Sequence, residues 1–199
     1  MADQVLVYIS AADDLGLERE VLGRAITEIP TTLAWRIVQT SSRAEEPALE
    51  AVVQADVHLL LLGSDVRAPV GVEWLAARRS GHTPFLLLKS ESTRTQAAQA
   101  FMKELERYTQ WHTFDDVARL RKQVLTLLAD HILTHRDHYQ LGDNEYEKLS
   151  DWLKNLRKAK RKKVDDTRGG ADKSSIILST ERYVPSEGVL LHDPNRQAP

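Results

Sequence analysis

The sequence predicts an α/β fold in which helices cover both faces of a five-stranded parallel sheet. Two observations support this prediction. Five short apolar or aromatic runs recur with their starts 24 to 28 residues apart, and segments with helical periodicity separate them. Strands and helices that alternate at this spacing form right-handed βαβ units, which build parallel sheets. A flavodoxin-like sheet is built from five such units.

Each expected strand is an apolar or aromatic run of strand length. The third and fourth runs are nearly continuous in apolar residues, as in strands that are covered on both faces. The five expected strands span residues 5–10, 33–39, 57–63, 85–90 and 110–114.

Helical stripes fill the intervals between these runs. Apolar residues from Val21 to Ile29 form one stripe, which Pro30 ends. Pro47 suits the first turn of a second helix. A further stripe runs from Ala98 to Tyr108, at helical spacing.

After the fifth run the sequence predicts a helical hairpin. A long helix starts near Asp115, and "QLGDNEYE" interrupts it, with Gly142 as the expected left-handed terminator. Asn144 and Glu147 then signal the start of a second helix. We expect the first arm to complete the α/β domain and the second arm to extend from it.

Composition divides the chain into three parts. Residues 1–140 form the α/β domain, 141–164 a basic helical extension, and 165–199 a linker and an irregular C-terminal tail. The tail contains "SIILS", an isolated run without a local partner strand. It is either a docking tail or the entry into a further domain.

Charge and cysteine content exclude several classes of protein. The chain has 27 basic and 29 acidic residues, a net charge of −2, which gives no overall attraction to nucleic acid or acidic membranes. It has no cysteine, so disulfides, thiolate zinc sites and cysteine nucleophiles are excluded. No signal peptide or membrane span is recognisable, so we expect a cytoplasmic protein.

Two further clusters have simple structural interpretations. Residues 154–163 hold seven basic side chains, which we interpret as a solvated helix end, not as a contact for nucleic acid or anionic lipid. His131, His135 and His138 fall on one helix face with a spacing that could bind a metal. No strong acidic cluster accompanies them, so we expect a packed or solvated face and no metal site.

Candidate site residues gather where the strands end, because ligands of open α/β sheets sit at the carboxyl ends of the strands. Ser10 ends the first expected strand, and Ser64 and Asp65 follow the third. Asp13 or Asp14 is expected to cap the first helix rather than to contact a ligand.

Glu73 is the strongest catalytic candidate. It lies just inside the helix after the third strand, and we expect it in the first turn, ionised and directed at the cleft. Such a carboxylate can stabilise or attack the ribose carbon during N-glycosidic cleavage of a nucleotide. The alternative is that Glu73 has no catalytic role and only places a negative charge in the first turn of the helix, where the helix dipole favours it. The neighbouring Trp74 could stack on a base or nicotinamide ring, or it could lie in the core.

Four segments, in order, resemble a TIR-like family of unknown function. They are "YISAADDLGLERE", "ADVHLLLLGS" followed by Glu73, "SGHTPFLLLK" and "DDVARLRKQVLTLLADHIL". The match covers roughly residues 4–135. The family is similar to TIR domains and nucleoside deoxyribosyltransferases, which share a flavodoxin-like sheet and a glutamate at the position of Glu73. Ala11 and His82 depart from its pattern, where a serine and a lysine are usual.

The resemblance implies an effector or signalling domain of an immunity-type switch protein, such as anti-phage defence. Such domains commonly precede nucleotide-binding ATPase modules and act when clustered, so self-association and such a module or another partner protein are expected. Three functions stay open. In the first, the chain cleaves NAD or a related nucleotide, and NAD is a substrate, so no cofactor is expected. In the second, the chain is a non-enzymatic association module, and in the third it is a deoxyribosyltransferase-like enzyme.

Overall fold

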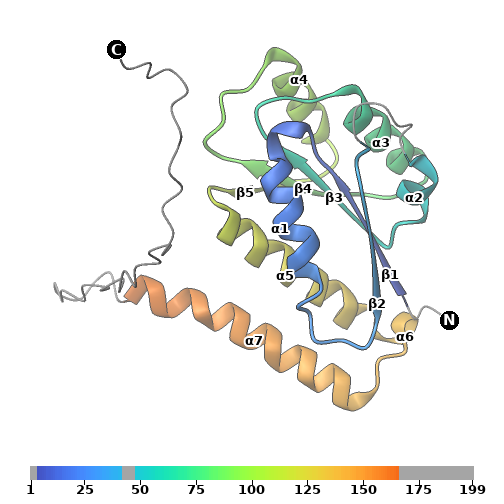
Figure 1. The fold of residues 1–199 in the computed structure, drawn as a ribbon, viewed down its shortest axis with the longest axis vertical. Helices are drawn as coiled ribbons and strands as arrows, with labels where there is room; N and C mark the ends of the chain where they lie inside the picture. The colour runs from blue at the N-terminus through green and yellow to red at the C-terminus, as the bar shows by residue number, and fades with distance from the viewer. Residues whose placement is uncertain (1–3, 42–47, 166–199) are drawn as a thin grey trace, which may run out of the picture.

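The molecule is a five-stranded, all-parallel sheet with helices on both faces (Figure 1). The structure, a computed structural model, describes residues 4–41 and 48–165. The strand order is β2-β1-β3-β4-β5, and every neighbouring pair runs parallel. This confirms the predicted α/β, flavodoxin-like class, and each strand lies within one residue of its predicted bounds. The strands are β1 (Gln4–Ser10), β2 (Ala34–Gln39), β3 (Val57–Leu62), β4 (Phe85–Lys89) and β5 (Trp111–Phe114).

The helices fill the predicted intervals. Seven α-helices and one short 3₁₀ helix are formed by the described residues. They are η1 (Asp13–Leu15), α1 (Gly16–Ile26), α2 (Leu49–Gln54), α3 (Ala68–Arg79), α4 (Gln96–Leu105), α5 (Val117–Thr134), α6 (Arg136–Tyr139) and α7 (Asp143–Asp165). Pro47 lies outside the described residues, so its place in the second helix is not described.

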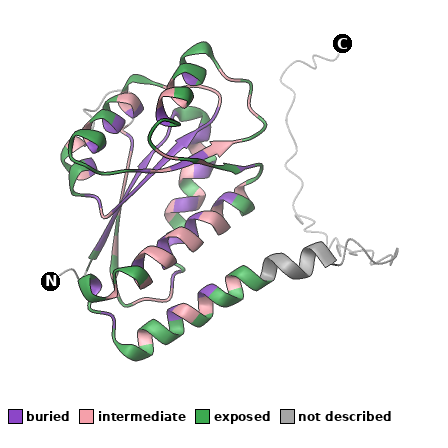
Figure 2. Cartoon of the chain, turned by 180° about the vertical axis from the view of Figure 1, so that it is seen from behind, coloured by how far each residue is buried: buried purple, intermediate pink, exposed green. Residues whose placement is uncertain are grey.

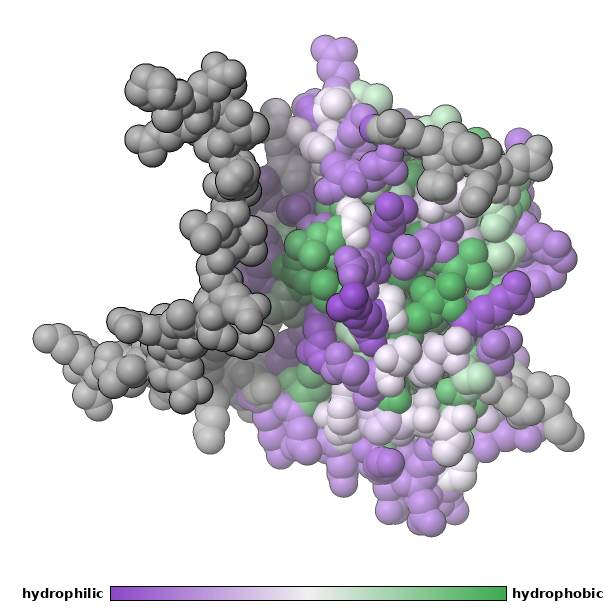
Figure 3. Space-filling view, viewed as in Figure 1, coloured by the Kyte–Doolittle hydropathy of each residue, from purple (hydrophilic) through white to green (hydrophobic). Residues whose placement is uncertain are grey.

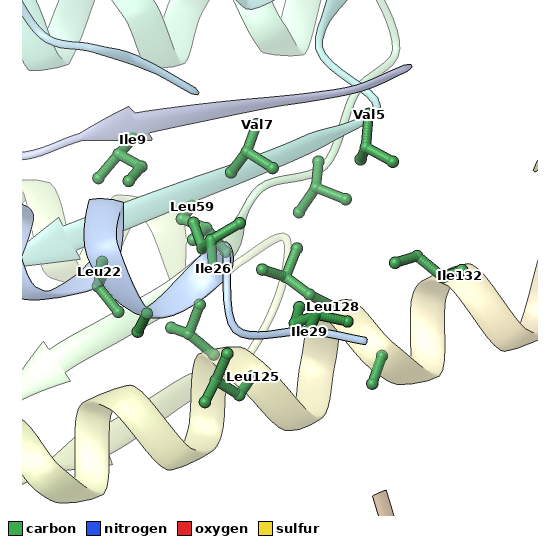
Figure 4. Close-up of a cluster of buried hydrophobic side chains, with 14 of the residues drawn as sticks. Val5, Val7, Ile9, Leu22, Ile26, Ile29, Leu59, Leu125, Leu128 and Ile132 are labelled. Atoms are coloured by element: carbon green, nitrogen blue, oxygen red, sulfur yellow. The ribbon is translucent and has the colours of Figure 1, made fainter. Parts of the chain in front are cut away.

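One face of the sheet packs against α1 and α5. Alternate residues of β1, which are Val5, Val7 and Ile9, point to this side and join apolar residues of both helices (Figure 4). All three side chains are fully buried. Successive strand residues point to opposite faces, so the residues of β1 that alternate with these three, such as Leu6 and Tyr8, face the other helical layer.

The opposite face packs against α2, α3 and α4. Leu6 and Tyr8 of β1 lie in one cluster with α2 and α3, while Leu60 and Leu86 lie in another with α3 and α4. The sheet is therefore buried on both sides, as its colouring in Figure 2 shows. Polar residues on this second face are enclosed with the core, and Ser10 is among them.

The predicted hairpin is present, with a different turn. Gln140, not Gly142, takes the left-handed conformation (φ 52°) at the end of α6. Helix α7 then runs beside α5, and Leu149 and Leu153 are buried in the same cluster as the α1/α5 core (Figure 1). The first half of the predicted extension is thus part of the packed structure.

Beyond α7 the predicted tail, including the "SIILS" run, lies outside the described residues. In the described ranges, no helix combines the length and the hydropathy that crossing a bilayer requires.

Candidate functional site

The candidate site lies at the point where the strand order reverses. Because β1 has β2 on one side and β3 on the other, the chain leaves the sheet in opposite directions from the carboxyl ends of β1 and β3. A crevice at such a point is the usual ligand site of open α/β sheets. Ser10 ends β1, and Gly63 and Ser64 follow β3.

A fully buried carboxylate lies beneath this edge. Glu73 of α3 is 0% exposed and accepts hydrogen bonds from three hydroxyl groups. Tyr8 donates to Oε1 at 2.8 Å, while Ser10 and Thr40 donate to Oε2 at 2.6 Å and 2.9 Å. The three donors come from β1 and from the residue after β2, so the network ties α3 to two strands.

The expected position of Glu73, in the first turn and directed at the cleft, is wrong. Helix α3 begins at Ala68, so Glu73 lies in the second turn and faces the sheet. Burial raises the pKa of Glu73 above its usual range, although the hydroxyl donors and the charge of Arg19 act in the opposite direction. The protonated form is therefore favoured more than the sequence suggested.

His58 extends the network on β3. Its Nε2 lies 2.8 Å from Ser10 Oγ, and the side chain is 4% exposed. Since the single proton of Ser10 is donated to Glu73, the serine oxygen accepts from Nε2–H of His58. Burial, followed by the charge of His82, lowers the pKa of His58 to about 4, so this ring is neutral at pH 7.

Two atoms of this network have unusual surroundings. Nδ1 of His58 is buried and has no hydrogen-bond partner. The pKa of Tyr8 is raised by burial and by the charge of Glu73, so its hydroxyl keeps the proton that it donates. Tyr8, Ser10, His58 and Glu73 thus form a polar cluster, with Thr40 beside it, inside an otherwise apolar layer.

Ser64 and Asp65, predicted to line a pocket, instead join neighbouring loops. Asp14 Oδ2 accepts from the amide and the hydroxyl of Ser64, at 2.7 Å and 2.6 Å. Thr95 donates to Asp65 at 2.8 Å. The structure does not bring either residue into hydrogen-bond contact with Glu73.

The predicted capping role of Asp13 or Asp14 is also wrong. Neither η1 nor α1 has a side-chain cap, because Asp14 binds Ser64 and Asp13 pairs with Arg67 at 2.9 Å. Gly63 makes this arrangement possible: a Cβ atom there would lie 2.4 Å from Asp14 Oδ2.

Trp74 belongs to the core. It is 4% exposed and packs in the α3/α4 cluster, with its ring 5.6 Å from that of Tyr108. The core alternative therefore describes its position, and a stacking role on a ligand ring is not supported.

Two cavities are open at the surface, and neither is lined by Glu73. One, of about 390 Å³, lies between α5 and α7 and is lined by Asp130, Tyr146 and Arg157 among others. The other, of about 540 Å³, lies between Arg36 on β2 and the start of α2. The carboxylate is thus closed off from both.

Of the three histidines of the α5–α6 region, His131 and His135 pack against each other, while His138 packs against Tyr139. His131 Nε2 lies 3.0 Å from the hydroxyl of Tyr139, and His135 Nδ1 lies 2.8 Å from the His131 carbonyl oxygen. Burial lowers the pKa of His131 to about 4. In the described part of the chain, no group of three or more potential metal-binding side chains has a suitable arrangement.

Sequence reasoning found Glu73 and Ser10 but missed Tyr8, Thr40 and His58. A signal was present, because Tyr8 and His58 are polar residues inside apolar strand runs. The register of β1 and β3 pairs these two residues directly, and their rings meet edge to face at 5.5 Å.

Comparisons with known proteins found no matching family model, no matching curated protein and no matching solved structure.

Proposed function

We propose that this chain is a TIR-like effector or signalling domain of an immunity-type switch protein, and that it cleaves NAD or a related nucleotide at the N-glycosidic bond. The observation that carries the proposal is the carboxylate of Glu73, held by three hydroxyl groups under the strand-order reversal. Together with Ser10, it lies beneath the carboxyl edge of the sheet, where ligands of open α/β sheets bind.

Glu73 would act on the ribose carbon C1′. The C1′–N bond breaks and its electron pair leaves with the base, while the carboxylate stabilises the cationic ribose or bonds to C1′. Water then attacks C1′, which releases the ribose product and restores the carboxylate. Ser10 and Tyr8 would orient the two carboxylate oxygens during both steps.

This chemistry requires opening of the site. Glu73 is fully buried, and burial raises its pKa, so the arrangement described here is a resting state. Contact with water would remove the desolvation that raises this pKa, which favours the ionised form. We propose that self-association, or an attached nucleotide-binding ATPase module, supplies this opening.

A non-enzymatic association module is the second candidate, and the closed position of Glu73 favours it. In that function the network would only tie α3 to the sheet. Exposed apolar side chains are available for contacts and lie on several elements: Leu17, Val53, Val72, Leu75, Tyr108 and Tyr146. On the face seen in Figure 3, apolar patches are small and are interspersed with hydrophilic residues.

The experiment incubates the full chain, concentrated or artificially oligomerised, with NAD and separately with nucleosides. We expect nicotinamide release by the wild type, and a loss of roughly 100-fold or more in Glu73→Gln. Glu147→Gln, an exposed change of the same kind on α7, should retain the activity. Circular dichroism confirms that each variant is folded.

The alternatives give different results. If no assembly state turns over any substrate, the association module is the better description. If Glu73-dependent exchange of bases between deoxynucleosides exceeds hydrolysis, the chain is a deoxyribosyltransferase-like enzyme.

A further inference from the structure

Arg19 of α1 is a half-buried cation without an anionic partner. Its only side-chain hydrogen bond within the described residues is a long one of 3.4 Å, from an Nη atom to the Thr40 carbonyl oxygen. Its Nε is buried and has no partner, and no described carboxylate lies within 4.0 Å of the guanidinium. A guanidinium group carries five N–H donors, so most of its binding capacity is unused.

Two more exposed arginines in the described ranges have carboxylate partners, whereas Arg94, just before α4, has only backbone acceptors and a buried, unpartnered Nε, as Arg19 has. Arg24, on the same helix as Arg19, binds Glu20 at 2.6 Å. Arg67, just before α3, binds Asp13 at 2.9 Å. Both pairs are more exposed than Arg19, so water could solvate these two guanidinium groups even without a carboxylate partner. A guanidinium in a half-buried position, with most of its donors unused, is suited to bind an anion.

Arg19 and Glu73 meet at the same residue. The Arg19 guanidinium contacts the carbonyl oxygen of Thr40, while Glu73 accepts from its hydroxyl. The two side chains reach Thr40 from opposite faces of the sheet, because α1 and α3 cover opposite faces. The positive charge of Arg19 also acts on Glu73, where it lowers the carboxyl pKa.

We propose that Arg19 binds the 5′-phosphate of a nucleotide whose C1′ is presented to Glu73. A guanidinium forms paired, charge-assisted hydrogen bonds with phosphate oxygens and matches their geometry. The phosphate and C1′ of a nucleotide are separated by the width of one ribose. Because Arg19 and Glu73 bind the same threonine at the carboxyl edge of the sheet, a phosphate on Arg19 would lie in the neighbourhood of the carboxylate.

This assignment rests on the proposed function of Glu73 and makes it more specific. It selects phosphorylated nucleotides over free nucleosides, because a nucleoside leaves the guanidinium unpaired. Arg19 is a specificity-determining residue in this scheme, not a group that acts on the bond that breaks.

The test measures binding and turnover separately. Calorimetric titration of the full Glu73→Gln chain, artificially oligomerised so that the site can open, compares nicotinamide mononucleotide with nicotinamide riboside. The substitution ensures that no turnover disturbs binding. We expect a preference of roughly 10- to 100-fold for the phosphorylated ligand. Adding Arg19→Gln should abolish that preference without weakening riboside binding, and adding Arg19→Lys should leave part of it.

Arg24→Gln is the matched control. It removes the same charge from the same helix at an exposed position, so it should keep the preference. Inorganic phosphate, titrated alone, tests whether the anion is bound without the nucleoside. Thermal unfolding of each variant checks that Arg19→Gln folds, and Arg19→Lys provides a second variant that keeps the charge.

The outcomes separate the two proposals. Equal affinity for both ligands, no binding of either, or a preference that survives Arg19→Gln overturns the assignment of Arg19. A preference lost with Arg19, together with absence of turnover by the wild type, supports Arg19 and rejects the hydrolase. Turnover of the mononucleotide and the riboside at equal efficiency supports the hydrolase and rejects the assignment of Arg19.

Discussion

At the scale of single residues, the chain encloses two carboxylates by different means. Glu18 is buried beside a cation, with Lys89 at 2.7 Å. Glu73 has only hydroxyl donors in hydrogen-bond contact, and desolvation outweighs them, which raises its pKa. Because no cation forms an ion pair with Glu73 within the described residues, opening to water would by itself lower the pKa of this carboxylate.

Gly63 provides a prediction at this scale. Gly63→Ala should destabilise the fold by roughly 1–3 kcal/mol, since the added Cβ would lie 2.4 Å from Asp14 Oδ2 and displace its bonds to Ser64. The matched change Gly71→Ala has open space around it inside α3 and should stabilise by up to about 1 kcal/mol.

Urea denaturation of both variants measures this difference. A Gly63→Ala variant as stable as the wild type would show that the Asp14–Ser64 contact is dispensable.

Part of the site could be predicted from the sequence. Ser10 and Glu73 stand out because strand ends and helix starts can be read from apolar runs. Thr40 lies at the carboxyl end of the second expected strand but was not singled out, because it is an ordinary polar residue in sequence and only the fold brings it to Glu73. The position of Asp14 was missed because a three-dimensional partner, Ser64, competed with the local cap.

At the scale of elements, the strands were predictable and the helix ends were less so. Continuous apolar runs such as that of β3 leave little choice of structure. The start of α3 was placed too late, because Pro69 suits a first turn and lies four residues before Glu73. Left-handed backbone at Gln140 has no clear sequence signal, since glycine is the usual residue there.

The packing of α7 on α5 can be tested with one buried leucine. Leu153→Ala should lower the free energy of unfolding by about 2–4 kcal/mol, because the side chain is buried in the α5–α7 contact. Leu17→Ala, at a position 62% exposed, should change it by less than about 0.5 kcal/mol.

The readout is the midpoint of urea denaturation. If the two variants were equally stable, α7 would not belong to the cooperative unit.

At the scale of the whole molecule, two histidines with lowered pKa make the fold sensitive to acid. His58 and His131 both have a pKa of about 4 in the folded chain, against 6.5 in the unfolded chain. The unfolded state therefore binds more protons between these values, so stability falls as the pH falls from 6.5 to 4. Glu73 acts in the opposite direction, because its raised pKa lowers stability as the pH rises above 4.5.

His58→Gln should remove one histidine from this balance. Between pH 7.5 and pH 4 the variant should lose roughly 3 kcal/mol less stability than the wild type, the amount that corresponds to the lowered pKa of one buried histidine. The glutamine amide can still donate to Ser10. Denaturation curves at the two pH values give the comparison, with exposed His112→Gln as the control.

An unchanged acid loss in His58→Gln would mean that His58 is already protonated in the native state. In that case Nδ1 would also carry a proton, while Nε2–H would still donate to Ser10.

The interior position of β1, between β2 and β3, also has a consequence for folding during synthesis. This strand leaves the ribosome first, yet it gains its second neighbour only when β3, ending at Leu62, has been made. The hydrogen bonds that Tyr8 and Ser10 donate to Glu73 span 65 and 63 residues of chain, and contacts of such long separation form late. A nascent chain therefore carries β1 with bare hydroxyls until α3 arrives, and that interval is when chaperones would have to protect it.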